Sequence, residues 1–199
     1  MISTIEQRLC QNQFYIFRGA LSCKQEAELQ LMFQYKARWS CHFDDDTFVN
    51  YGQLRKTLES YDETKEIYLG RRSVAKPISI SYNYEDNHKQ SSFVFGTGGA
   101  GWCISRPLLI KIEKVLSETT FSDISNQIRL PDDVTVGFVV NELLKIELTN
   151  DDHFNSHLTN LASLDPTQQV RRWESLRYKN TKTNSSILCA NANVVNLIL

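Results

Sequence analysis

The sequence is poor in the residues that mark several classes of protein. Its 199 residues include only 8 glycines and 4 prolines, and neither charge dominates, with 22 Lys and Arg against 23 Asp and Glu. So little Gly and Pro excludes a collagen-like chain, and 41% hydrophobic residues exclude a disordered one. With a formal charge of −1, the chain has no general electrostatic attraction to nucleic acids or anionic membrane surfaces, on which basic binders depend. We therefore expect a globular domain with no nucleic-acid partner.

Long hydrophobic runs are absent as well. Residues 1–20 contain neither a basic start followed by an apolar run, as in a signal peptide, nor a membrane span. The last ten residues, 190–199, are apolar but too short to cross a bilayer. No signal or transmembrane segment is visible in this sequence.

Cysteine is present in an odd number. The five cysteines are Cys10, Cys23, Cys41, Cys103 and Cys189. The chain is too long to be a small disulfide scaffold, and the spacing alone does not reveal which cysteines pair.

The pattern of apolar residues predicts helices that alternate with strands. Ser22 and Gln25 suit a capping box that opens a helix over 21–36, and Ser105 with Pro107 suits the start of another helix. Residues 79–87 read as turn formers, and residues beyond 166 as irregular. Further strands are expected at 38–43, 67–69 and 92–95, and further helices at 48–60 and 134–144. This alternation indicates an α/β sheet.

Three consecutive aspartates, Asp44 to Asp46, directly follow the first expected strand. Like charges this close disfavour joint ionisation unless a cation or strong donors lie beside them. A divalent metal such as Mg²⁺ or Mn²⁺, shared with substrate phosphates, is one explanation. A solvated acidic turn is the other. Ligands of α/β sheets bind at the carboxyl ends of strands. At this position the metal site is therefore favoured about as much as the solvated turn.

Three other features have both a structural and a chemical interpretation. The segment Gly96–Gly101 is either a tight turn or a loop whose backbone approaches a phosphate or sugar, although its spacing matches no nucleotide-binding fingerprint. Asp132 and Asp133 suit a helix start, but a carboxylate held there also suits a general base. His157 is either a packed histidine or a metal ligand.

Four ordered motifs together resemble the Fringe family of glycosyltransferases, over roughly residues 20–157. They are Trp39–Asp46, Phe95–Arg106, Arg129–Asp133 and Phe154–Leu158. The resemblance implies a GT-A type, Rossmann-like nucleotide-sugar fold. It also implies inverting β-1,3 transfer of N-acetylglucosamine from UDP-GlcNAc to fucose O-linked on EGF-like repeats, such as those of Notch receptors.

The resemblance also assigns roles to residues. Asp46 and His157 would bind Mn²⁺, and Asp45 would support the nucleotide sugar. Asp133 would be the catalytic base that takes the proton of the fucose hydroxyl. The substrate contacts would further include Asp132, Gly98, Gly99, Ala100 and Gly101.

The cysteines and two departures from the family pattern complete the comparison. Cys41 and Cys103 fall where the family forms a disulfide, whereas the family partner of Cys23 has no counterpart at 11–19. Asn155 replaces a common histidine, and Val134 stands where a cysteine usually follows the two aspartates. We favour His157 as the metal ligand because it is the histidine of this motif that the sequence keeps.

The resemblance further predicts how the chain is organised and where it acts. Residues 1–20 would be a divergent segment, 21–178 the C-terminal part of a Fringe-like domain and 179–199 an irregular tail. Only 43 residues precede Asp44, fewer than a nucleotide-binding half needs, so we expect a fold incomplete at its N-terminus. Fringe-like enzymes are Golgi membrane proteins facing the lumen, anchored by a segment upstream of this chain. A β-1,3-galactosyltransferase of the same superfamily and a truncated, non-enzymatic relative are the alternatives.

Overall fold

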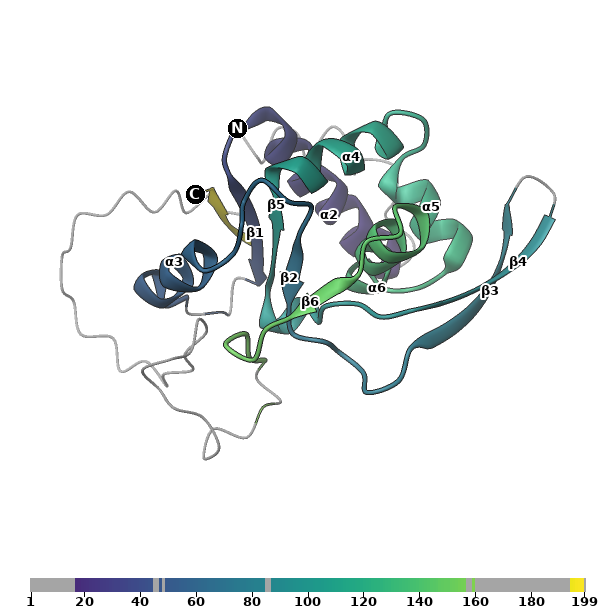
Figure 1. Cartoon of the computed structure of the whole chain (residues 1–199). Helices are drawn as coiled ribbons and strands as arrows, with labels where there is room; N and C mark the ends of the chain where they lie inside the picture. Colours follow the sequence, from purple (N-terminus) through teal and green to yellow (C-terminus); the bar gives the residue numbers. More distant parts are fainter. Residues whose placement is uncertain are drawn as a thin grey trace.

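A computed structural model of the chain describes residues 17–44, 47, 49–84, 87–156, 159 and 194–198. Within these residues the fold is mixed α/β, with a central five-stranded sheet and a separate two-stranded hairpin (Figure 1). The α/β class expected from the sequence is therefore confirmed.

The central sheet has the strand order β6-β2-β5-β1-β7. Its strands are β1 (Trp39–Asp44), β2 (Tyr68–Gly70), β5 (Trp102–Ser105), β6 (Leu148–Asn150) and β7 (Val194–Ile198). β2 pairs with β6 in parallel, and β5 pairs antiparallel with both β2 and β1. It follows that β1, β2 and β6 run in one direction and end at the same edge of the sheet.

Helices cover both faces of this sheet. On one face lies α3 (Tyr51–Glu59), and on the other lie α2 (Phe17–Gln34), α4 (Arg106–Leu116), α5 (Phe121–Ile128) and α6 (Asp132–Gly137), which continues as a π-helix over Phe138–Leu143 (Figure 1). Successive side chains of a strand point to opposite faces of the sheet, so each strand contributes to both cores. Trp102 and Ile104 of β5 pack on the four-helix side, whereas Cys103 between them packs on the α3 side.

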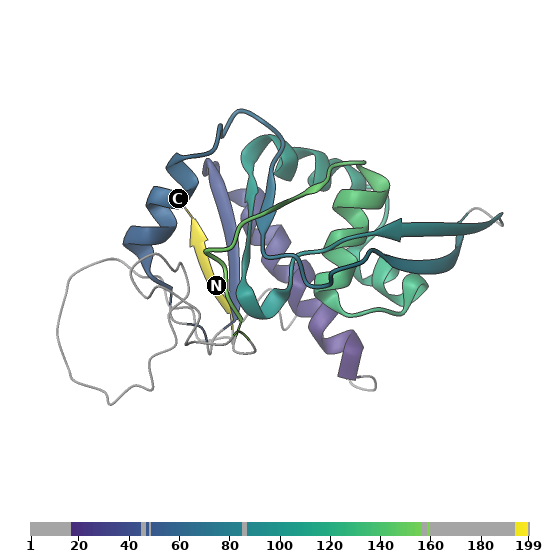
Figure 2. The same ribbon diagram turned by 60° about the horizontal axis from the view of Figure 1, so that its bottom comes forward.

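The hairpin of β3 (Ile78–Tyr84) and β4 (Asn87–Phe93) projects from the body of the molecule (Figure 2). The prediction of turn formers at 79–87 was therefore wrong over most of that range. The apolar residues of β3 alternate with serines, and one face of the hairpin packs on the core through Ile80, Tyr82 and Phe93. The polar residues that suggested a turn occupy the other face.

Several further predictions need correction. Ser22 lies inside α2 rather than at its start, and its buried hydroxyl is hydrogen-bonded to Ser125 Oγ at 2.6 Å. Ser105 does precede α4, but its hydroxyl donates to the carbonyl of Lys65 and accepts from the amide of Ile67 instead of capping the helix. β5, β6 and α5 were not predicted, and the tail 179–199, expected to be irregular, contains β7 paired with β1.

Two disulfides involve described cysteines. Cys41 and Cys103 face each other in the β1–β5 register and are bonded, as the family resemblance implied. Cys23 is also disulfide-bonded. Cys23 therefore has a disulfide partner, although the family partner has no counterpart at 11–19.

Candidate active site

The edge at which β1, β2 and β6 end gathers most of the predicted site. Asp44 is the last residue of β1, Arg71 follows β2, and Asp151 follows β6. Gly96–Gly101 leads into β5, which runs the opposite way, so this loop reaches the same edge. Carboxyl ends of strands are where α/β sheets bind ligands, and four segments distant in sequence converge here.

Asp133 lies in the first turn of α6, partly buried against the Gly-rich loop. Its Oδ2 accepts a hydrogen bond from the Gly98 amide at 3.2 Å, and its Oδ1 accepts one from the Val134 amide at 2.8 Å. Asp132 is its neighbour at the start of the helix. Two backbone donors therefore fix the orientation of the Asp133 carboxylate.

Burial raises the pKa of Asp133 above its usual value, and the charge of Asp132 adds to this effect. The bonds from Gly98 and Val134 and the charge of His42 act in the opposite direction. A carboxylate with a raised pKa is a stronger base, which suits proton abstraction from a hydroxyl group.

The Gly-rich loop uses most of its amide groups within the protein. The amide of Gly96 donates to the Tyr68 hydroxyl at 3.1 Å, that of Thr97 donates to the Arg71 carbonyl, and that of Gly98 donates to Asp133. The amides of Ala100 and Gly101 close turns onto residues 97 and 98. Ala100 and Gly101 are buried, so Gly98 and Gly99 are the parts of the predicted substrate loop that are partly open to solvent.

A buried ion pair lies beside Asp44, the first residue of the triple aspartate at 44–46 (the acidic turn). His42 is stacked on Trp102, with ring centroids 5.1 Å apart, and its Nδ1 lies 2.8 Å from Glu28 Oε2. Its Nε2 lies 3.4 Å from Asp44 Oδ1. Burial alone would lower the pKa of His42, but Glu28 and Asp44 outweigh it and raise this pKa to about 10. The imidazole therefore carries a positive charge at neutral pH.

Arg71 attaches the segment that precedes His157 to the same edge. Its guanidinium donates to Asn155 Oδ1 at 2.6 Å and to the Phe154 carbonyl at 3.3 Å. Phe154 is buried, and its ring stacks on Phe43 of β1 with centroids 6.3 Å apart. Asn155 is 2% exposed, and its side-chain oxygen accepts a hydrogen bond from Arg71. It therefore serves here as a structural residue of the loop.

A buried carboxylate organises the start of this loop. Asp151 accepts hydrogen bonds from the Tyr61 hydroxyl at 2.9 Å and from the His153 amide at 2.8 Å, and His153 Nδ1 lies 2.6 Å from its Oδ1. Burial and this bond to Asp151 raise the pKa of Tyr61 to about 12. Asp151 thus joins the turn after β6 to the segment that follows α3.

The remaining predicted site residues are not part of the described structure. Asp45, Asp46 and His157 lie outside the described residues. Among the described residues no group of three His, Cys, Asp or Glu side chains could hold a metal ion. No helix in the described part of the chain is long and apolar enough to span a membrane.

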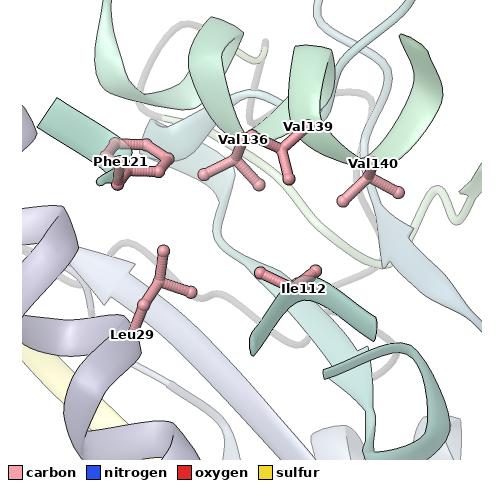
Figure 3. A pocket seen from close by; sticks show the side chains of 6 residues that line it. All are labelled: Leu29, Ile112, Phe121, Val136, Val139 and Val140. Carbon is pink, nitrogen blue, oxygen red and sulfur yellow. The ribbon is translucent and has the colours of Figure 1, made fainter. Parts of the chain in front are cut away.

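The pocket shown in Figure 3 is a packing feature away from this edge. It is lined only by apolar side chains, from Leu29, Ile112, Phe121, Val136, Val139 and Val140, and holds about 10 Å³. That volume is at the lower limit for a single water molecule, so a sugar nucleotide cannot bind there.

Sequence reasoning missed the side chains that organise the site rather than those predicted to react. His42 stands two residues before Asp44, on the same strand face, which was an available signal. Glu28, Arg71 and Asp151 reach their partners across helices and strands. No local sequence pattern marks such contacts.

Comparison with known proteins agrees with the motifs. The family model described as Fringe-like matches residues 2–196. The Fringe glycosyltransferase of Drosophila melanogaster is 43% identical over 144 residues, which are 71% of this chain and 35% of that protein. The β-1,3-N-acetylglucosaminyltransferases lunatic fringe of Xenopus laevis and Homo sapiens are 38% and 39% identical over 162 residues, which are 81% of this chain and 43% and 42% of those proteins. The chain thus spans about two fifths of the length of these relatives.

Proposed function

Because this chain belongs to the Fringe-like family, we propose that it is a glycosyltransferase with a GT-A type nucleotide-sugar fold. It transfers N-acetylglucosamine from UDP-GlcNAc in β-1,3 linkage to fucose O-linked on EGF-like repeats, such as those of Notch receptors. The observation that carries this proposal is the Asp133 carboxylate, which Gly98 and Val134 hold against the Gly-rich loop.

Asp133 acts as the general base of an inverting displacement. A sugar hydroxyl is a weak nucleophile, and a carboxylate within hydrogen-bond reach makes it reactive by taking its proton as the new bond forms. The hydroxyl oxygen attacks the anomeric carbon of the donor sugar, and the UDP diphosphate leaves from the opposite side. The raised pKa of Asp133 suits this role, while the amides of Gly98 and Val134 keep its carboxylate oriented.

The donor set proposed for Mn²⁺ consists of Asp46 and His157, with Asp45 supporting the nucleotide sugar. Carboxylate and imidazole are suitable ligands for this ion. The described residues on either side fit the assignment, because Asp44 and the loop up to Ser156 are both held at one sheet edge through His42 and Arg71. When bound, the ion would offset the charge that develops on the diphosphate.

The Golgi lumen is the proposed site of action. The buried Cys41–Cys103 disulfide supports this, because disulfides form and persist in oxidising compartments.

Binding and transfer measurements test the proposal. UDP is titrated calorimetrically into the purified chain with and without Mn²⁺. Transfer to a fucosylated EGF repeat is then measured with UDP-GlcNAc and with UDP-galactose. Mn²⁺-dependent UDP binding and preferential use of UDP-GlcNAc are the expected results. Preference for UDP-galactose would favour the galactosyltransferase alternative, and no UDP binding would contradict the proposal for this chain.

A further inference from the structure

Three charged side chains form a row that begins in the core and ends at the acidic turn. Glu28 on α2 is 4% exposed and His42 on β1 is 5% exposed. Nδ1 of His42 lies 3.0 and 2.8 Å from the two Glu28 oxygens, and its Nε2 lies 3.4 Å from Asp44 Oδ1. The Asp44 side chain is 44% exposed. The row therefore connects the interior with the solvent-facing end of β1.

The row holds each of its members in one orientation. Gln25 Nε2 donates to Glu28 Oε2 at 2.9 Å, which fixes the carboxylate, and the stack on Trp102 fixes the plane of the imidazole. With Nδ1 directed at Glu28, Nε2 points along the strand face that His42 shares with Asp44.

Stability alone does not account for this arrangement. A buried ion pair contributes little net stability, because the loss of hydration offsets much of the attraction, and apolar residues of similar volume often serve as well. The geometry instead favours a role for the outer end of the row, where Asp44 lies.

Asp44 also contacts Thr47, the residue that follows the triple aspartate. Its carbonyl accepts a hydrogen bond from the Thr47 amide at 3.0 Å, so the residues on both sides of Asp45 and Asp46 are joined. We infer that Glu28 and His42 are positioning residues: they hold Asp44, the first residue of the segment proposed to bind a divalent cation and a sugar diphosphate. This inference rests on the proposed function for the identity of the ligand.

The experiment separates positioning from fold stability with a double variant. Glu28→Gln with His42→Phe removes both charges, but keeps the contact of residue 28 with Gln25 and an aromatic ring against Trp102. Ser22→Ala is the matched control, because it removes a buried hydrogen bond of the same helix α2, to Ser125, away from the turn. Urea unfolding, amide hydrogen exchange of Thr47 and Mn²⁺-dependent UDP binding are measured for each protein.

The double variant is expected to unfold at about the same urea concentration as the control. Its Thr47 amide should exchange about tenfold faster than in wild type, and its Mn²⁺-dependent UDP affinity should fall about tenfold or more. Ser22→Ala should change neither quantity. Should the double variant fail to fold, Glu28→Gln alone is expected to give smaller changes in the same direction.

Two results would overturn the inference. One is Thr47 exchange at the wild-type rate in the folded variants, and the other is wild-type UDP affinity in a variant whose Thr47 amide is no longer protected. Absence of UDP binding in the wild type would instead refute the proposed function. The Thr47 exchange rate still decides in that case whether Glu28 and His42 hold the turn.

Discussion

A substitution at Gly101 tests whether the Gly-rich loop needs a glycine to pack against β1. Its φ of 79° and ψ of 163° lie in a region that side-chain-bearing residues rarely adopt. A Cβ atom on Gly101 would overlap the ring of Phe43 and lie 2.9 Å from the His42 carbonyl oxygen. Both neighbours belong to β1, directly before the acidic turn, so the glycine allows this strand to lie against the loop.

Gly101→Ala should therefore destabilise the fold strongly. The backbone conformation costs about 1–3 kcal/mol for a non-glycine residue. Overpacking against Phe43 costs about 1–3 kcal/mol more. Their sum is about 2–6 kcal/mol, and a loss of about 4 kcal/mol would lower the Tm by roughly 8–16 °C in a chain of this size.

Urea unfolding followed by tryptophan fluorescence measures this loss. The matched control is Gly52→Ala in α3, where an added Cβ meets only Asn50 Oδ1, at 3.7 Å. Alanine is the better helix former, so this control, near the start of α3, should be at least as stable as wild type. A Gly101→Ala protein as stable as wild type would refute the packing argument for the loop.

Three further predictions concern the disulfide, the base and the buried cation. Replacing Cys41 and Cys103 by alanine should lower the free energy of unfolding by about 4 kcal/mol in urea titrations, because the bond closes a loop with a sequence separation of 62. A loss below 1 kcal/mol would contradict this. Asp133→Asn should abolish transfer and leave Mn²⁺-dependent UDP affinity within twofold of wild type. Wild-type transfer should also fall on acidification at a pH above the usual aspartate range, because burial raises the pKa of Asp133. Loss of UDP binding in this variant would show that the role of Asp133 is structural. The pKa of His42 is raised from 6.5 to about 10 in the folded state, so folding favours its charged form. The free energy that protonation of His42 adds to folding is therefore complete below pH 6.5 and is lost as pH rises to about 10. Urea titrations are repeated between pH 6.5 and pH 10. The free energy of unfolding should fall less with rising pH in the Glu28→Gln, His42→Phe variant than in wild type. An equal fall in both proteins would contradict a raised pKa of His42.

Sequence patterns predicted the elements whose signal is local. The helix after Ser105 and the strand before Asp44 follow from proline placement, helix periodicity and β-forming residues within a short window. The hairpin at 78–93 was not predicted, because its signal is not local. Its serines resemble turn formers, and only the core packed against Ile80 and Tyr82 reveals the alternation of a strand.

The same limit applies to the site. The motifs predicted Asp133 as the base, and the structure provides the two amides that orient it. Glu28 is 14 residues from His42, and Arg71 is 84 residues from Asn155. Such contacts depend on how strands and helices pack, and a pattern read along the chain does not contain that information.

The hydrogen bonds of the Gly-rich loop change the interpretation of its glycines. A loop that binds phosphate presents several free amide groups to its ligand. Here five of the amides in 96–101 already donate within the protein, and the amide of Gly98 donates to the Asp133 carboxylate. An added Cβ on Gly98 would lie 3.4 Å from Asp133 Cβ, an ordinary van der Waals contact, so the loop packs directly against α6 at this point. The described amides of the loop therefore serve to hold its conformation and to orient the carboxylate of Asp133, the proposed base.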